Sequence, residues 1–102
     1  MELELLDANL RRIANELGHR PEGWGDDETQ HFLLIAQCAQ AAKTETDLLG
    51  FRMLRLRVRP DEPRKSWFQL GTQRRLTITF NDENGPLIAQ FDLAVTRMEV
   101  PK

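Results

Sequence analysis

The stretch Arg75-Leu-Thr-Ile-Thr-Phe80, followed by Asn81-Asp-Glu-Asn-Gly85 and Leu87-Ile-Ala-Gln-Phe-Asp-Leu-Ala-Val95, decides the fold class. Apolar and polar residues alternate on both sides of the turn, and a period of two is that of a strand with one buried face. Asn84-Gly85 supplies the positive φ angles of a tight turn. The stretch therefore predicts two antiparallel strands joined as a hairpin.

Two further strands are predicted upstream of this hairpin. Between Leu54 and Arg59 apolar and basic residues alternate, so a strand is expected to bury three apolar side chains and to project three arginines from its other face. Those arginines are Arg55, Arg57 and Arg59. Pro60 and Pro63 end this strand and open a loop. Trp67–Leu70 is predicted as the next strand, before a turn at residues 71–73.

The first half of the chain has a helical period. Apolar residues recur at spacings of four, three and four from Leu6 to Leu17, with Asp7 as a predicted N-cap and Gly18 as a stop. A second helix is predicted from Asp26 or Asp27 to near Lys43, with a short strand at residues 2–6 and a turn at 44–47. We therefore expect a single α+β domain over residues 1–102. Two N-terminal helices would pack on one face of a small antiparallel sheet of three to five strands.

Charge is divided unequally along the sequence. Residues 1–50 carry ten carboxylates and four basic side chains, whereas residues 52–75 carry eight basic side chains and two carboxylates. Such a separation indicates a face that meets an anion, with nucleic acid as the first candidate and an acidic protein as the second. An ordinary solvated strand face, charged to prevent aggregation, is the alternative. The basic residues are Arg52, Arg55, Arg57, Arg59, Arg64, Lys65, Arg74 and Arg75.

Other site classes are disfavoured. Cys38 is the only cysteine and lies in an apolar helical pattern, so we expect a buried structural thiol and no disulfide. No Cys/His cluster has metal-ligand spacing, and no glycine-rich phosphate loop is present, so no metal or cofactor is expected. The apolar runs are too short for a membrane span, and Met1-Glu-Leu-Glu4 does not resemble a signal peptide. These features predict a cytoplasmic, bacterial protein with no membrane partner.

The two tryptophans are candidates for stacking on bases. Trp24, in the glycine-flanked loop Glu22-Gly-Trp-Gly25, is the better candidate for recognition, although it would equally well cover the core from outside. Trp67, at strand spacing, is expected to be in the core or half-buried. His31 is expected to have a structural or surface role.

The order of several short stretches resembles a known family. The stretches are Ala8–Ile13, Thr44–Leu49, Arg52–Arg55, Arg64–Trp67 and Arg74–Phe80, followed by an acidic turn with Asn84-Gly85. A leading strand, a helical pair, a basic loop, a Trp-led strand and an Arg-Ile-Thr-Phe-like strand come in this order in the RelE/ParE superfamily of toxin–antitoxin toxins. The HigB, or plasmid maintenance killer, branch is the most similar.

The resemblance implies a RelE-like fold, ribosome-dependent mRNA cleavage or translation inhibition, and neutralisation by a cognate antitoxin. The catalytic candidates are Arg55, Lys65, Arg75 and Asp92, and the residues expected to bind nucleic acid or a partner are Arg52, Arg57, Arg59, Arg64, Arg74 and Trp24. In RelE-like enzymes arginine and lysine can take over part of the proton transfer, which is the role implied for Arg55 and Lys65.

The chain departs from the family at its catalytic residues. Where the mRNA-cutting members have a histidine after the second helix, this sequence has Leu54 or Arg55, and at the Asp-Tyr-His-like ending it offers only Asp92. The chain contains no tyrosine. Two alternatives therefore stay open. One is a non-catalytic interaction module that uses the same basic patch to bind an acidic partner, and the other is a gyrase-targeting toxin of the ParE type.

Overall fold

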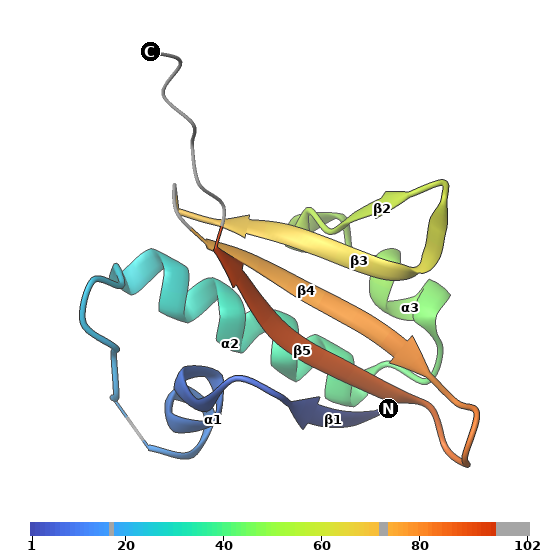
Figure 1. The fold of residues 1–102 in the computed structure, drawn as a ribbon, viewed down its shortest axis with the longest axis horizontal. Helices are drawn as coiled ribbons and strands as arrows, with labels where there is room; N and C mark the ends of the chain where they lie inside the picture. The colour runs from blue at the N-terminus through green and yellow to red at the C-terminus, as the bar shows by residue number, and fades with distance from the viewer. Residues whose placement is uncertain (17, 72–73, 96–102) are drawn as a thin grey trace.

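The computed structural model, which describes residues 1–16, 18–71 and 74–95, contains a five-stranded mixed sheet with its helices on one face (Figure 1). The strand order is β1-β5-β4-β3-β2, in which β1 and β5 are parallel and the other pairs antiparallel. The elements are β1 (Glu2–Leu5), α1 (Ala8–Asn15), α2 (Asp26–Ala41), α3 (Glu45–Leu49), the 3-10 helix η1 (Arg52–Leu54), β2 (Arg57–Arg59), β3 (Glu62–Leu70), β4 (Arg74–Asn81) and β5 (Ile88–Val95).

The predicted hairpin is confirmed as β4 and β5. Ile78 pairs with Phe91 and Phe80 with Ala89, so the apolar positions of the two strands lie opposite one another on the same face. All four residues are buried. The alternation along the sequence therefore corresponds to the two faces of the sheet, one packed and one open.

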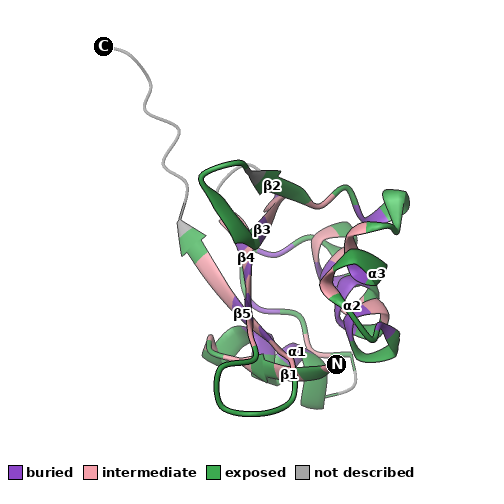
Figure 2. Cartoon of the chain, turned by 90° about the vertical axis from the view of Figure 1, so that its right-hand side faces the viewer, coloured by how far each residue is buried: buried purple, intermediate pink, exposed green. Residues whose placement is uncertain are grey.

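The core lies between this sheet and the helices, which Figure 2 shows on one side of the strands. Asp7 caps α1 as predicted, because its Oδ1 accepts from the backbone N–H of Asn9 at 2.8 Å and of Leu10 at 3.2 Å. The α1 side chains Leu10 and Ile13 are buried. From α2 the buried side chains are Thr29, Phe32, Ile35, Ala36 and Ala39. The α+β class and the helix-on-sheet packing are thus as predicted.

The direction of β1 differs from the prediction of an antiparallel sheet. β1 lies at one edge and runs parallel to β5, with Leu3 opposite Ala89. The α-ammonium group of Met1 donates to the carbonyl oxygen of Ala39 at 3.1 Å. That carbonyl lies in the last turn of α2, where the helix dipole favours a cation. The strand is therefore held in place from the helix layer as well as by β5.

Several local predictions are wrong. The loop expected from Pro60 to the start of a strand at Trp67 is shorter, because β3 already begins at Glu62 and includes Pro63. Residues 44–47 do not form a simple turn, because Thr44 and Asp47 make a reciprocal capping box that starts α3. Residues 54–59 do not form one strand, since Leu54 ends η1 and only Arg57–Arg59 pairs with β3. As a result Val58, expected to be buried, is 42% exposed.

An ion pair between Glu28 and Arg74 ties the start of α2 to the start of β4. Oε2 of Glu28 accepts from Nη1 of Arg74 at 2.7 Å, and both side chains are about 20% exposed. Gly71 passes so close that an added Cβ would come within 2.8 Å of Glu28 Oε1, and its φ of +64° also favours glycine. The pair therefore sits in a tightly packed corner of the fold.

Replacing Glu28 with alanine is expected to lower the free energy of unfolding by about 1–2 kcal/mol, because the Arg74 guanidinium stays largely covered and loses its carboxylate. Asp27→Ala is the matched control, since it also removes a carboxylate from the first turn of α2. Its expected cost is only the helix-dipole contribution, about 0.3–1 kcal/mol. Urea unfolding followed by circular dichroism measures both; equal losses would contradict a stabilising role for the pair.

Candidate functional site

The structure divides the basic residues of 52–75 according to their partners. Arg64 donates to Oδ1 of Asp82 at 2.9 Å and also pairs with Oε1 of Glu45. These bonds raise the pKa of the Arg64 guanidinium, and the hydrogen bond from Arg64 lowers the pKa of Asp82. A carboxylate with a lowered pKa contributes stability above its unfolded pKa, and this contribution is lost as the pH falls through the folded pKa. Arg64 is thus part of a structural ion-pair group.

Arg74 and Trp24 belong to the core side of the fold. Trp24 is only 6% exposed, and the Arg74 guanidinium lies 4.8 Å from the centroid of its ring. Arg74 also donates to the Gly23 carbonyl at 3.2 Å and pairs with Glu28. Trp24 therefore covers the core, which is one of the two interpretations that the sequence left open, and Arg74 is paired within the fold. A binding role for either residue stays a prediction.

The sheet face opposite the helices carries the remaining candidates in rows across the strands. Arg57 pairs with Trp67, Trp67 with Thr77, and Thr77 with Asp92, so these four side chains project from the same face. Arg75 precedes Thr77 by two residues and thus lies on this face as well. The predicted basic face is present, but it is narrower than the charge pattern of the sequence indicated.

A hollow of about 440 Å³ opens on this face, and we call it the arginine hollow. Trp67 lies at its base, with the Arg75 guanidinium 4.0 Å and the Arg57 guanidinium 5.4 Å from the ring centroid. Both distances are within the range of cation–π attraction, which favours a guanidinium placed over the ring. The lining residues are Arg55, Arg57, Trp67, Phe68, Gln69 and Arg75.

Three arginines of the hollow have no carboxylate partner. Within the described part of the chain, Arg55, Arg57 and Arg75 form no ion pair, unlike Arg64 and Arg74. In addition, Nε of Arg75 and Nε1 of Trp67 are buried without a hydrogen-bond partner among the described residues. Both are donors. The arginine hollow therefore combines three cations with N–H groups, which suits an anion with several oxygens, such as a phosphate.

Arg55 reaches the hollow through an unusual backbone. It follows η1 with φ 56° and ψ 32°, in the left-handed region, and it is the only non-glycine residue with positive φ in the described chain. For a residue other than glycine this conformation costs about 1–2 kcal/mol. Strained residues concentrate at functional sites, so the strain supports a role for Arg55 in the site.

The other two catalytic candidates lie on the open face but outside the hollow. Lys65 is exposed, 4.0 Å from Oε1 of Glu62. Asp92 is half-buried, and its Oδ1 accepts from the N–H of Leu93 at 2.8 Å. Asp92 is two strands away from Trp67, a distance of about 10 Å at ordinary strand spacing. The four predicted catalytic residues are therefore not gathered around one point.

Of the last two binding candidates, only Arg52 can be placed relative to the hollow. Arg52, on η1, is exposed and is not among the lining residues. The side chain of Arg59 lies outside the described part of the structure.

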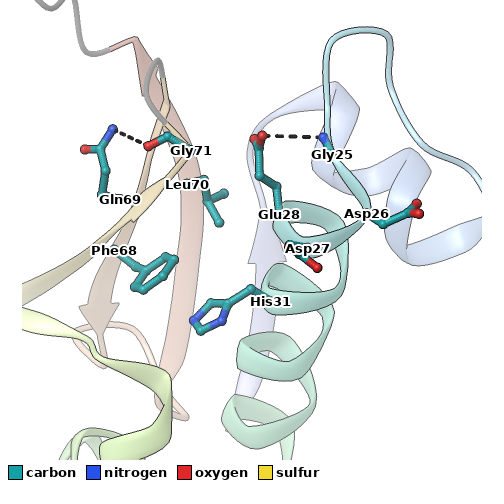
Figure 3. A pocket seen from close by; sticks show the side chains of 9 residues that line it. All are labelled: Gly25, Asp26, Asp27, Glu28, His31, Phe68, Gln69, Leu70 and Gly71. Carbon is teal, nitrogen blue, oxygen red and sulfur yellow. Dashed lines mark hydrogen bonds between the residues drawn. The ribbon is translucent and has the colours of Figure 1, made fainter.

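A second hollow, of about 650 Å³, lies between the start of α2 and the end of β3 (Figure 3). It is the larger of the two, but its charge is mostly neutralised within the fold. Asp26 pairs with Arg20 at 2.6 Å, and Glu28 pairs with Arg74. His31 and Phe68 stack at its inner end. The arginine hollow, with its unpaired cations, is therefore the better candidate for a binding site.

His31 of α2 contacts the Leu54 carbonyl of η1 and the ring of Phe68 of β3. These contacts were not predicted from the sequence. The place of His31 on the inner side of the helix, one residue before buried Phe32, was the only available signal. Among the described residues, no group of three or more His, Cys, Asp or Glu side chains is placed to hold a metal ion. In the same residues, no helix has the length and apolar character of a membrane span.

Comparisons with protein-family models, with curated proteins and with solved structures found no match to this chain.

Proposed function

We propose that the chain is the toxin component of a bacterial toxin–antitoxin system, of the RelE/HigB type, and that it inhibits translation by binding RNA in the arginine hollow. The single observation that supports RNA binding is the set of three arginines around the half-buried indole of Trp67, which have no carboxylate partner among the described residues. The toxin context rests on the order of sequence motifs. A cytoplasmic location, a ribosome-bound mRNA target and a cognate antitoxin are parts of the same proposal.

RNA fits the chemistry of the hollow better than an isolated carboxylate does. Guanidinium groups bind phosphate oxygens in a bidentate manner, and an arginine held over an aromatic ring by cation–π attraction is already partly ordered for such contacts. Flanking guanidinium and indole planes also offer stacking surfaces to unpaired bases. Arg57 and Arg75 provide both features at neighbouring positions on the sheet.

The geometry supports binding more strongly than cleavage. RNA cleavage through the 2′-hydroxyl needs a base near the phosphate and an acid for the leaving oxygen. Among the residues that the structure describes, those that line the arginine hollow include no histidine and no carboxylate. Any cleavage would therefore depend on proton transfer by Arg55, or by Lys65 reaching in from outside the hollow. Mapping of RNA ends after incubation of RNA with the protein decides whether cleavage occurs.

A second candidate function is a non-catalytic module that binds an acidic protein through the same residues. This candidate is favoured because the described lining residues include no histidine or carboxylate that could act as a general base. The acidic-protein module and the RNA-binding toxin are distinguished by the kind of polyanion that binds the hollow. An acidic peptide such as oligoglutamate would bind while single-stranded RNA of similar charge would not.

Replacing Arg55, Arg57 and Arg75 together with glutamine is expected to weaken RNA binding about tenfold per residue, from roughly 1.5 kcal/mol per charge-assisted contact. Fluorescence anisotropy with a labelled 20-nucleotide single-stranded RNA measures the change. The slope of log affinity against log salt should also fall from about −2 toward zero, because three phosphate contacts are lost.

The matched control replaces Arg12, Arg20 and Lys43 with glutamine. These residues lie in the helical half, and the change in net charge is the same. The control should bind RNA as the unmodified chain does. If both triple variants bound RNA as tightly as the unmodified chain, the assignment of the hollow would be contradicted. Equal weakening of both would indicate a non-specific effect of net charge.

A further inference from the structure

We infer that His31 is a positioning residue for the site, which holds Arg55 at the arginine hollow through the carbonyl group of Leu54. The inference deepens the proposed function and rests on it for its consequence in RNA binding. His31 itself lines the second hollow, on the helix side of β3, and is not among the lining residues of the arginine hollow (Figure 3). Its effect on a ligand is therefore indirect.

The first step is the hydrogen bond between α2 and η1. Nε2 of His31 lies 3.1 Å from the carbonyl oxygen of Leu54. A carbonyl oxygen only accepts, so Nε2 carries the proton and donates. Leu54 is fully buried, and the bond itself is partly buried at the edge of the second hollow, which His31 lines.

The second step is that this carbonyl belongs to the peptide unit directly before Arg55. The N–H of the same peptide unit donates to the carbonyl oxygen of Arg52 at 3.1 Å. The plane of the unit is therefore held at both ends, by His31 through its oxygen and by Arg52 through its nitrogen. With the chain on both sides in place, a flip of this peptide plane would change ψ of Leu54 and φ of Arg55 together. The two bonds oppose such a flip and thereby favour the observed φ of 56°.

The third step fixes His31 itself. Its imidazole stacks on the ring of Phe68 with a centroid distance of 4.0 Å and an interplanar angle of 14°. Figure 3 shows the two side chains side by side. Phe68 is the β3 neighbour of Trp67, whose side chain projects from the opposite face of the sheet. The His31–Phe68 ring pair, together with the bond from His31 to the Leu54 carbonyl, thus links η1 to β3. β3 is the strand that also carries Trp67 of the arginine hollow.

The direction of the Arg55 side chain depends on these contacts. If φ relaxed to the negative values that arginine prefers, the Cα substituents would rotate about the N–Cα bond. The guanidinium would then move away from the hollow that Arg57 and Arg75 line. His31 therefore offsets the strain at Arg55, and the ligand benefits from a preorganised third cation.

Two variants separate the donor from the ring. His31→Phe keeps a flat ring against Phe68 and removes the donor, whereas His31→Gln removes the ring and keeps an N–H donor. Gln30→Ala, at an exposed position of the same helix, is the control. Nuclear magnetic resonance gives a readout that does not depend on RNA, because the one-bond Cα–Hα coupling of Arg55 distinguishes positive from negative φ.

We expect His31→Phe to lose the positive-φ coupling at Arg55 and to bind the labelled 20-nucleotide RNA about tenfold more weakly. Arg55→Gln should cause the same loss, and the double variant should be no weaker than either single variant, because both changes remove one contact. His31→Gln should restore part of the coupling and of the affinity. The control should match the unmodified chain in both measurements.

Unchanged coupling and unchanged affinity in a folded His31→Phe variant would overturn the inference, and so would additive losses in the double variant. The unmodified chain supplies a test that needs no variant, since the imidazole of His31 must carry its proton on Nε2 to donate to the Leu54 carbonyl. A ¹⁵N spectrum that places this proton on Nδ1 would also overturn the inference. If the unmodified chain binds no RNA, the proposed function fails, while the Arg55 coupling still decides whether His31 sets the backbone.

Discussion

Replacing Phe91 with alanine is expected to lower the free energy of unfolding by about 3–5 kcal/mol. Phe91 is fully buried at the centre of β5, opposite Ile78 of β4. Its ring meets that of Phe32 of α2 edge to face, with 6.1 Å between centroids and 73° between planes. The substitution therefore removes the contact through which α2 packs on the middle of the sheet, and it leaves a cavity that the surrounding strands fill only in part.

Urea unfolding followed by circular dichroism measures this loss. Gln90→Ala is the control on the neighbouring position of β5, where the side chain faces away from the core and bonds Glu4 at 3.2 Å on an exposed surface. Its expected effect is within about 0.5 kcal/mol. A cost for Phe91→Ala as small as that of the control would mean that β5 does not pack against α2.

The parts of the fold that were predicted correctly are those whose signal is local. The β4–β5 hairpin follows from alternation within neighbouring residues. The predicted positive φ angles are present only in part, at Gly85 (142°) and not at Asn84. The start of α1 follows from the side chain of Asp7, which satisfies two N–H groups within three residues. A local pattern of this kind is sufficient because the interactions that it specifies are themselves short in sequence.

The parts that were predicted incorrectly depend on contacts distant in sequence. Four alternating residues in β1 indicate a strand but not its direction, which is set by pairing with β5 at the other end of the chain. The run from Leu54 to Arg59 has strand periodicity, yet Leu54 is drawn into the core at the end of η1, and its carbonyl is bonded by His31 of α2. Packing of one buried leucine thus overrides the local alternation.

In the candidate site, too, the local signal was read correctly and the contacts distant in sequence were not. The basic patch was visible in the sequence, but the sequence could not show which cations are neutralised within the fold. Arg64 meets Glu45, 19 residues earlier, and Arg74 meets Glu28, 46 residues earlier. After these pairs are removed, Arg55, Arg57 and Arg75 remain around Trp67. Partner choice across the fold, and not the number of arginines, therefore defines the site.

Tightly induced expression of the unmodified chain in a bacterial host is expected to arrest growth and protein synthesis soon after induction. The triple variant of Arg55, Arg57 and Arg75 to glutamine should abolish this arrest. The reason is the expected loss of affinity, roughly a thousandfold for three charge-assisted contacts, which would leave an RNA target unoccupied at ordinary cellular concentrations. Radiolabelled methionine incorporation and colony counts provide the two measurements.

The control is again the triple variant of Arg12, Arg20 and Lys43, which lowers the formal net charge of −2 by the same three units. It should arrest growth as the unmodified chain does, because these cations lie on the helical half, away from the open face of the sheet. Immunoblotting confirms equal soluble amounts of the three proteins. Continued growth with abundant unmodified protein would contradict the toxin proposal and favour a module that binds an acidic protein. Arrest by the hollow variant would place the toxic surface elsewhere on the chain.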